Sequence, residues 1–144
     1  MSVLMNVLTC KCVNSWIIEY VNLLIMKAQG ILYDKSKLFA LGVIALCNEL
    51  REKGEYVMSK QILKSGTSIG ANYCEAVCAE SPQDFIHKVS ISIKEANETY
   101  YWLDLLHDSK YLDNERYTQM SNQVEELFKM LNSSAITVKQ RLAH

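Results

Sequence analysis

Carboxylates at helical spacing are the residues of this sequence whose types first suggest chemistry. They are Glu75, Glu95 and Glu98, and two Asp-x-x-His pairs begin at Asp84 and Asp104. Helical bundles hold two metal ions when such ligands project inward from separate helices. Both Asp-x-x-His pairs fall in one predicted helix, about 30 Å apart along its axis, so they cannot share a metal. We expect no metal and no cofactor, and we expect the glutamates to fix helix register or to face solvent. A small enzyme or metal protein built on these glutamates is the alternative that metal analysis would test.

Ser65, Thr67 and Ser68 are the candidate nucleophiles, and Gly66 and Gly70 are the candidate phosphate-loop glycines. A nucleophile elbow needs a strand–turn–helix context, which this stretch lacks. Serines within helices more often bond back to the carbonyl of the preceding turn. A phosphate loop needs a Gly-Lys-Ser/Thr ending, which is also absent. The sequence therefore predicts no catalytic residue and no enzyme.

The charge balance argues against a strong nucleic-acid-binding surface. The chain carries 15 basic and 16 acidic residues, for a net charge of −1. Proteins that bind phosphate backbones normally show a basic excess. We therefore expect only weak, salt-sensitive binding to nucleic acid. Any contact would come from Lys60, Lys64, Lys88 and Lys94.

The cysteines indicate a reducing compartment. Their number is odd and their spacing matches no disulfide framework, so we expect free thiols and a cytoplasmic protein. Cys74 and Cys78 lie one helical turn apart, and we expect both to be small buried side chains. The five cysteines are Cys10, Cys12, Cys47, Cys74 and Cys78.

Residues 1–30 form an N-terminal extension, and residues 31–144 form the predicted domain. The extension lacks a signal peptide's early positive charge and cleavage site, and charges interrupt every window long enough to span a membrane. Residues 13–26 have the spacing of an amphipathic helix. We expect residues 1–25 to be dispensable to the fold, because the first clearly capped helix begins later, at about residue 35.

That first helix is predicted over residues 35–53. Asp34 is its expected N-cap and Gly54 its expected stop. Its expected core-facing side comprises Leu38, Leu41, Ile44, Ala45, Leu46 and Leu50.

The second helix is predicted over residues 57–79, although Gly66 and Gly70 interrupt it. Apolar residues recur at helical spacing throughout this stretch. Each interior glycine costs about 1 kcal/mol relative to alanine. Two glycines four residues apart indicate a small-residue groove into which another helix packs. The alternative is a loop over residues 65–70 between two short helices.

Two further helices follow, over residues 82–109 and from Asp113 onward. Ser81 is the expected N-cap of the third helix and Pro82 its first residue. Asp113 is the expected N-cap of the fourth helix. Four amphipathic helices joined by short loops predict an all-α fold, an antiparallel up-down four-helix bundle.

The run Tyr100-Tyr101-Trp102 cannot face one core, because successive helical residues are rotated by about 100°. At least one large aromatic side chain must face another surface, which is typical of an interface. A core residue flanked by a half-exposed tyrosine is an equally good interpretation.

Two blocks carry a resemblance to a known family. They are KQILKSGTSIGANYCEA at residues 60–76 and DFIHKVSISIKEANET at residues 84–99. Both resemble the four-helix-bundle proteins encoded in 23S rRNA intervening sequences, except that Lys64 stands where that family often has arginine. Relatives include the accessory variability determinant of diversity-generating retroelements. That protein looks like a pentameric barrel that engages a reverse transcriptase and nucleic acid.

The resemblance implies a homo-oligomer, with a pentameric ring as the expected form. We therefore expect a non-enzymatic structural or partner-binding module, without membrane contact. A nucleic-acid-binding accessory protein of an rRNA insertion or of a reverse-transcriptase element is the alternative. The second and third helices are the expected subunit contact. The candidate interface or bundle-packing residues are Gly66, Gly70, Asn72, Glu75, Tyr101 and Trp102.

Overall fold

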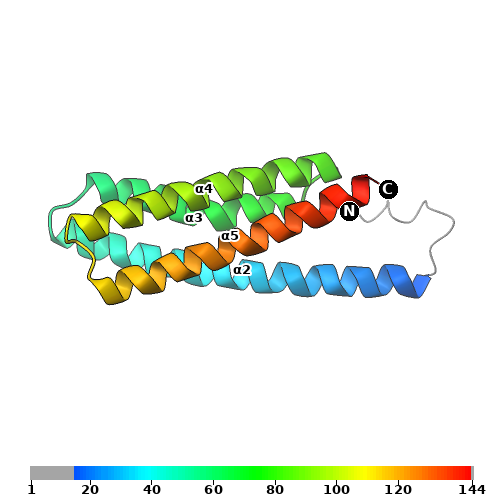
Figure 1. Cartoon of the computed structure of the whole chain (residues 1–144), viewed down its shortest axis with the longest axis horizontal. Coiled ribbons are helices and arrows are strands. Elements are labelled where there is room, and N and C mark those ends of the chain that lie inside the picture. Colours follow the sequence, from blue (N-terminus) through cyan, green and yellow to red (C-terminus); the bar gives the residue numbers. More distant parts are fainter. Residues whose placement is uncertain (1–14, 144) are drawn as a thin grey trace.

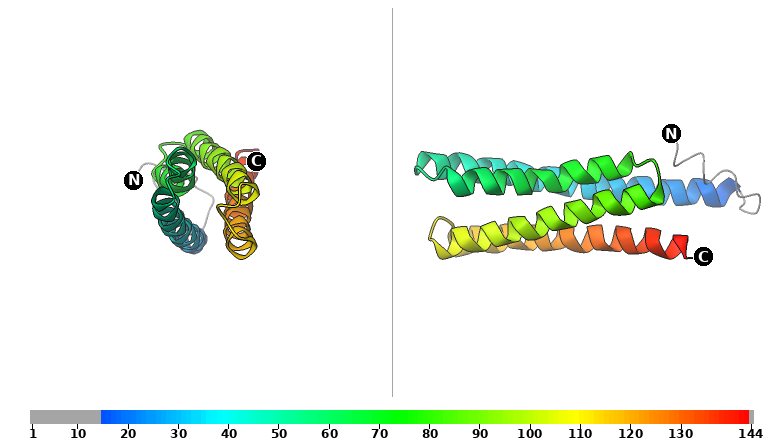
Figure 2. Two further views of the ribbon diagram at one scale, coloured as in Figure 1. Left: turned by 90° about the vertical axis from the view of Figure 1, so that its left-hand side faces the viewer. Right: turned by 90° about the horizontal axis from the view of Figure 1, so that it is seen from above.

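Four antiparallel helices make up the described part of the chain (Figure 1). This computed structural model describes the backbone of residues 15–143 and the side chains of residues 30–143. No strand occurs among those residues. The predicted all-α antiparallel four-helix bundle is confirmed, and its long axis is evident in Figure 2. The helices are α2 Ser15–Glu52, α3 Val57–Val77, α4 Pro82–Asp108 and α5 Asn114–Leu142.

The caps of α4 and α5 are those that the sequence predicts. Ser81 Oγ accepts a hydrogen bond from the backbone N–H of Asp84 at 3.1 Å, and Pro82 opens α4. Asp113 Oδ1 accepts from the backbone N–H of Arg116 at 2.8 Å. Each cap satisfies a donor that the first turn of a helix leaves unpaired.

The predicted start of the first helix is wrong. Helix α2 begins at Ser15, so Asp34 is an interior residue rather than an N-cap. No proline interrupts this segment, and the hydroxyl of Ser36 donates to the carbonyl of Tyr33 at 2.9 Å, in the manner of a helical serine. The proposed division after residue 30 therefore falls inside a helix. The apolar face predicted for residues 13–26 lies outside the described side chains.

The predicted core face of this helix is also wrong in part. Leu46 and Leu50 are buried as expected, but Leu38, Leu41 and Ile44 are 62%, 55% and 41% exposed, and Ala45 is exposed too. Helix α2 carries two apolar stripes, and spacing alone does not show which one meets the bundle. The buried stripe comprises Leu32, Phe39, Val43, Leu46, Cys47 and Leu50.

The glycines of α3 explain why the stripe of α2 that contains Val43 is buried, rather than the stripe that contains Leu38 and Leu41. A Cβ atom added to Gly66 would lie 2.9 Å from Val43 Cγ2, and one added to Gly70 would lie 2.9 Å from Ser36 Oγ. Helices α2 and α3 thus approach more closely than a larger residue would allow. The predicted continuous helix and its small-residue groove are confirmed, and the groove is filled within the bundle by α2.

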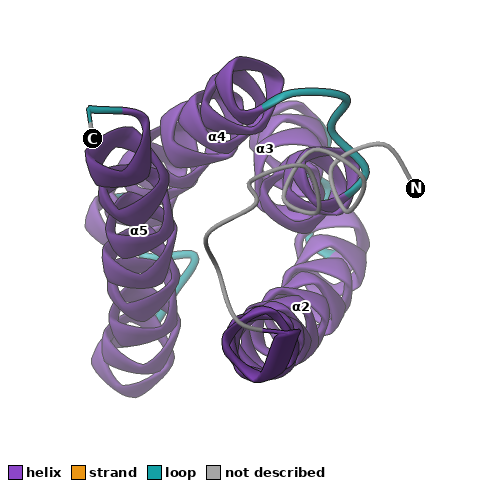
Figure 3. Cartoon of the chain, turned by 90° about the vertical axis from the view of Figure 1, so that its right-hand side faces the viewer, coloured by secondary structure: helices purple, strands orange, loops and turns teal. Residues whose placement is uncertain are grey.

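The core lies between all four helices, with α3 between α2 and α4 (Figure 3). Helices α2 and α4 lie at opposite corners and barely contact each other. Ion pairs from Lys35 to Glu126 and from Arg116 to Glu49 connect α2 with α5. Among residues 15–143, no helix is long and apolar enough to cross a membrane.

Candidate functional site

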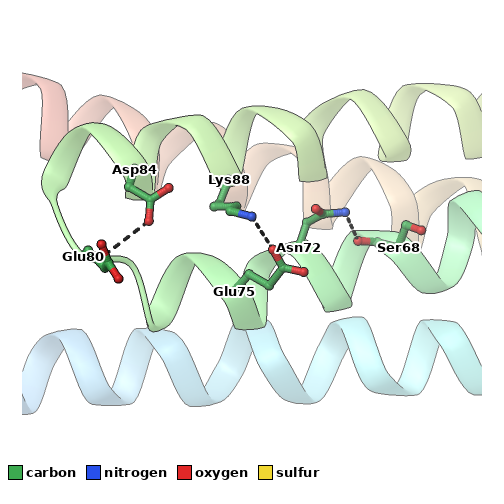
Figure 4. Close-up of polar contacts among 6 residues, drawn as sticks. All are labelled: Ser68, Asn72, Glu75, Glu80, Asp84 and Lys88. Atoms are coloured by element: carbon green, nitrogen blue, oxygen red, sulfur yellow. Dashed lines mark hydrogen bonds and ion pairs between the residues drawn. The ribbon is translucent and has the colours of Figure 1, made fainter. Parts of the chain in front are cut away.

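The seam between α3 and α4 brings together several of the predicted site residues (Figure 4). The carboxylate of Glu75 on α3 forms an ion pair with Lys88 on α4, which raises the pKa of Lys88. Asn72 Nδ2 donates to the carbonyl of Ser68 one turn earlier, at 2.8 Å. Asn72 and Glu75 therefore fix the local structure of α3 and its register with α4.

The other two candidate glutamates lie further along α4. One carboxylate oxygen of Glu95 is buried and has no hydrogen-bond partner within residues 30–143. Burial raises the pKa of Glu95, the neighbouring Glu98 raises it further, and Lys64 opposes the effect. Glu98 itself accepts a hydrogen bond from Trp102 Nε1 at 3.2 Å.

The predicted carboxylate set does not converge on one point. Glu75 is paired with Lys88, and Glu95 lies seven residues beyond Lys88 on α4, about 10 Å along the helix axis. Within residues 30–143, no three Asp, Glu, His or Cys side chains come close enough together to hold a metal ion. Glu75 thus makes a contact between helices, whereas the partly buried carboxyl of Glu95 makes no such contact in this part of the chain.

The four candidate nucleic-acid contacts are spread along the seam. Lys60, Lys64 and Lys94 are exposed, while Lys88 is engaged with Glu75. Lys60 and Glu75 are fifteen residues apart on α3, which is about 22 Å at 1.5 Å per residue. Carboxylates lie between these lysines, so the four do not form a compact basic patch.

The second Asp-x-x-His pair belongs to a network that joins α4 to α5. Asp104 accepts a hydrogen bond from the hydroxyl of Tyr117 at 2.6 Å, which raises the pKa of Tyr117. The ring of His107 stacks on Tyr117 with a 4.2 Å centroid separation. His107 Nε2 also lies 2.7 Å from Asn114 Oδ1 at the start of α5. These contacts hold the last turn of α4 against the first turn of α5.

The candidate nucleophiles are likewise engaged or enclosed within α3. Thr67 Oγ1 donates to the carbonyl of Leu63 at 2.7 Å, as expected of a helical hydroxyl. Ser65 is fully buried and its hydroxyl has no partner among residues 30–143. Neither hydroxyl is oriented by a histidine or a carboxylate.

A shallow hollow of about 330 Å³ lies between α2 and the end of α3. Cys74 lines it, and both Cys74 and Cys78 are exposed free thiols, so their predicted burial is wrong. The reason is that Tyr73, Ala76 and Ala79 face the core at this end of α3, so Cys74 and Cys78 lie off the core face. Cys47 is the buried thiol, and Cys10 and Cys12 lie outside the described residues. The other lining residues are Gly30, Tyr33, Tyr73 and Val77.

Two sets of exposed apolar side chains, among several within residues 30–143, have no role inside the bundle. The first, here called the α2 stripe, comprises Ile31, Leu38, Leu41 and Ile44. The second, here called the α4 tyrosines, comprises Tyr100 at 39% exposure and Tyr101 at 56%. Trp102 is half-buried and meets Tyr101 edge to face at 5.3 Å. The aromatic run indicated the second patch from sequence, whereas Leu38, Leu41 and Ile44 of the first patch were assigned to the core.

Comparison with known proteins gives a family match over most of the chain. Residues 29–133 match the family model described as 23S rRNA-intervening sequence protein. A crystal structure of a protein of unknown function from the S23 ribosomal protein family of Bacteroides thetaiotaomicron is 50% identical, with a TM-score of 0.71. The match covers 72% of this chain and 97% of that one. No curated protein matches this chain.

Proposed function

This chain belongs to the 23S rRNA-intervening sequence protein family, and we propose that it is a non-enzymatic module that assembles into a symmetric ring. The ring serves as a structural or partner-binding unit in the cytoplasm, where the exposed thiols of Cys74 and Cys78 stay reduced. Five copies is the number that the family resemblance implies.

The α2 stripe is the observation that carries this proposal. Leu38 and Leu41 are more than half exposed and lie three residues apart on α2, and Ile44 follows three residues later. Burying one such side chain stabilises a contact by about 1.5–3 kcal/mol relative to leaving it in water. Scattered apolar residues need no partner, but a contiguous set on one helix marks an interaction surface. A further copy of this chain is the occupant that the family resemblance favours.

The polar residues support a structural rather than a catalytic role. Glu75 is paired with Lys88, away from the neighbouring Glu95 and Glu98, and the Asp104–His107 pair is tied to Tyr117 and Asn114. A nucleophile needs a base within hydrogen-bond reach, and that base needs an orienting group. Ser65, Thr67 and Ser68 do not have this arrangement.

Weak, salt-sensitive binding to nucleic acid stays a prediction. Lys60 and Lys64 lie on α3 and Lys94 lies on α4, and Glu95 and Glu98 are also on α4, with Lys64 close enough to Glu95 to affect the pKa of that carboxyl. Three lysines beside carboxylates neutralise few phosphates, so the affinity for nucleic acid is low at physiological salt. A role beside a reverse transcriptase would therefore depend on protein contacts more than on phosphate contacts.

Replacing an exposed leucine of the α2 stripe tests the proposal. Leu41→Glu should give particles of lower mass by light scattering, with helicity by circular dichroism unchanged, because Leu41 does not contribute to the core. Ile136→Glu is the matched control, since Ile136 is 53% exposed but lies on α5. Unchanged assembly in Leu41→Glu would remove the α2 stripe from the contact, and a monomeric unmutated protein would refute assembly itself.

A further inference from the structure

Two exposed thiols lie at the end of α3. Among residues 30–143 the free cysteines are Cys47, Cys74 and Cys78, and only the last two are exposed. Cys47 is buried, and its Sγ donates to the carbonyl of Ser59 at 3.2 Å. Cys74 lines the hollow between α2 and α3, so solvent reaches it. The exposure of Cys74 and Cys78 removes the packing role that the sequence predicts for them and leaves both thiols accessible to ions.

Cys74 and Cys78 are one helical turn apart on the same side of α3. Cys74 belongs to the last turn, and Cys78 is the C-cap, with φ −94° and ψ 13°. The backbone N–H of Cys78 donates to the carbonyl of Glu75 at 3.1 Å, so the helical winding continues as far as Cys78. Side chains four residues apart on a helix have Cβ atoms about 5–6 Å apart. The backbone therefore holds the two thiols as neighbours.

This spacing suits an ion between the two sulfurs better than it suits a disulfide. A disulfide needs Cβ atoms about 3.5–4.5 Å apart, so the helix must distort before Cys74 and Cys78 can be joined. A bond from thiolate to metal is about 2.3 Å long in zinc sites, so two sulfurs on opposite sides of one ion are about 4.6 Å apart. Each Sγ lies one bond beyond its Cβ, and rotation about the Cα–Cβ bonds brings the two sulfurs to that separation.

The number of ligands determines the class of ion. Within residues 30–143, no three Asp, Glu, His or Cys side chains come close enough together to hold a metal ion, and the neighbouring Glu75 is paired with Lys88 on α4. Structural zinc sites use four protein ligands, and calcium and magnesium use six or more oxygen ligands. Thiolates select soft cations such as Cu(I). Cu(I) is complete with two thiolates in line, which is what Cys74 and Cys78 offer.

We propose that Cys74 and Cys78 form a two-coordinate site for a soft monovalent cation, with Cu(I) as the ion that fits it. When the ion binds, each thiol releases its proton to water and two bonds form between Sγ and copper. Copper stays Cu(I) throughout, so no oxidant or reductant is consumed. The site lies within one chain, so it is independent of the proposed assembly and adds metal binding to it.

Titration of Cu(I) against a coloured Cu(I) chelator, in the absence of oxygen, tests the proposal. The protein is the full chain carrying Cys10→Ser and Cys12→Ser, because these two cysteines would also bind copper. We expect one Cu(I) per chain and no change in mass by light scattering. Cys74→Ser and Cys78→Ser should each weaken binding about 100-fold or more, because the second sulfur is then no longer supplied by the same chain.

A change of spacing is the matched control. The double variant Ser68→Cys/Cys78→Ser keeps two cysteines on α3 but places them six residues apart, about 9 Å along the axis. It should bind Cu(I) as weakly as Cys78→Ser does. Cys47→Ser should bind as tightly as its parent, because Cys47 is buried elsewhere. Circular dichroism checks that each variant is folded.

Three results would overturn the proposal. The first is an unchanged affinity in Cys74→Ser or in Cys78→Ser. The second is tight binding by the double variant Ser68→Cys/Cys78→Ser, which would show that any two thiols suffice. The third is half an ion per chain together with an increase in mass, which would show that the ion bridges two chains.

Discussion

Replacing Gly66 by alanine should destabilise the bundle, although alanine is the better helix former. The new Cβ would lie 2.9 Å from Val43 Cγ2 and 3.1 Å from Val43 Cγ1. Val43 is fully buried and β-branched, so it cannot rotate both methyl groups away. Overpacking of this kind costs about 1–3 kcal/mol, whereas the gain in helix propensity is about 1 kcal/mol. We expect a net loss of about 1 kcal/mol in the free energy of unfolding.

A double-mutant cycle with Val43→Ala isolates this contact. Val43→Ala removes both methyl groups that the new Cβ would meet, so Gly66→Ala in that background should stabilise by about 1 kcal/mol. The sign of the effect thus reverses, with a coupling of about 2 kcal/mol between the two sites. Gly30→Ala is the control, because Gly30 is within α2 and a Cβ there meets nothing within 4 Å. It should stabilise in either background.

Urea denaturation followed by circular dichroism gives these free energies. All variants are compared at one protein concentration, because assembly couples stability to concentration. If Gly66→Ala stabilises the unmutated background as much as Gly30→Ala does, the close approach of α2 and α3 is not the reason for the glycine.

Four further predictions concern the caps, Glu95, the extension and nucleic acid. Ser81→Ala and Asp113→Ala should each lower the free energy of unfolding by about 1 kcal/mol in urea titrations, and an unchanged free energy of unfolding would contradict the stabilising role of the caps. Because burial raises the pKa of Glu95, the folded state holds its proton more tightly, and the resulting stability is lost as pH rises through the raised pKa. Glu95→Gln should therefore become increasingly more stable than the unmutated protein from acid to neutral pH, and a difference independent of pH would refute this. Residues 26–144 should melt cooperatively without residues 1–25, and a fall of many degrees would show that the extension packs on the bundle. Fluorescence anisotropy at physiological salt should detect only weak nucleic-acid binding, and sub-micromolar affinity would reveal a basic patch that the seam between α3 and α4 does not show.

The elements with local signals could be predicted from sequence. Ser81 and Asp113 are capping residues followed by helical spacing, and both caps form as expected because they depend on neighbouring backbone donors alone. The glycine-containing helix α3 was also predictable, since its apolar residues recur at helical spacing, and the spacing of its two glycines predicted the groove. Their partner residues, Val43 and Ser36, could not be named, because pairing between distant segments leaves no trace in one sequence.

The orientation of α2 was the main failure, and its cause is physical. This helix has one apolar stripe through Phe39 and Val43 and another through Leu38 and Leu41, and periodicity treats them alike. The choice is made by the shape of α3, which admits Val43 beside Gly66. Helix α2 also continues on the N-terminal side of Asp34. A residue that favours capping does not start a helix when the residues before it are helical as well.

The candidate site was predictable only in its aromatic part. Three consecutive aromatic residues required one to leave the core, and Tyr101 does so. Leu38, Leu41 and Ile44 were assigned to the predicted core, and the exposure of Cys74 follows from Tyr73 and Ala76 facing the core instead. Spacing along the chain identified these side chains but not the surfaces to which they belong.

The mass of the unmutated protein in solution tests the central claim most directly. Multi-angle light scattering across a dilution series should give one species of about five times the 16.5 kDa chain mass, because a closed ring has no free contact for further growth. Another fixed multiple would keep the assembly and change only the number of copies. A mass near 16.5 kDa at micromolar concentration would contradict the account.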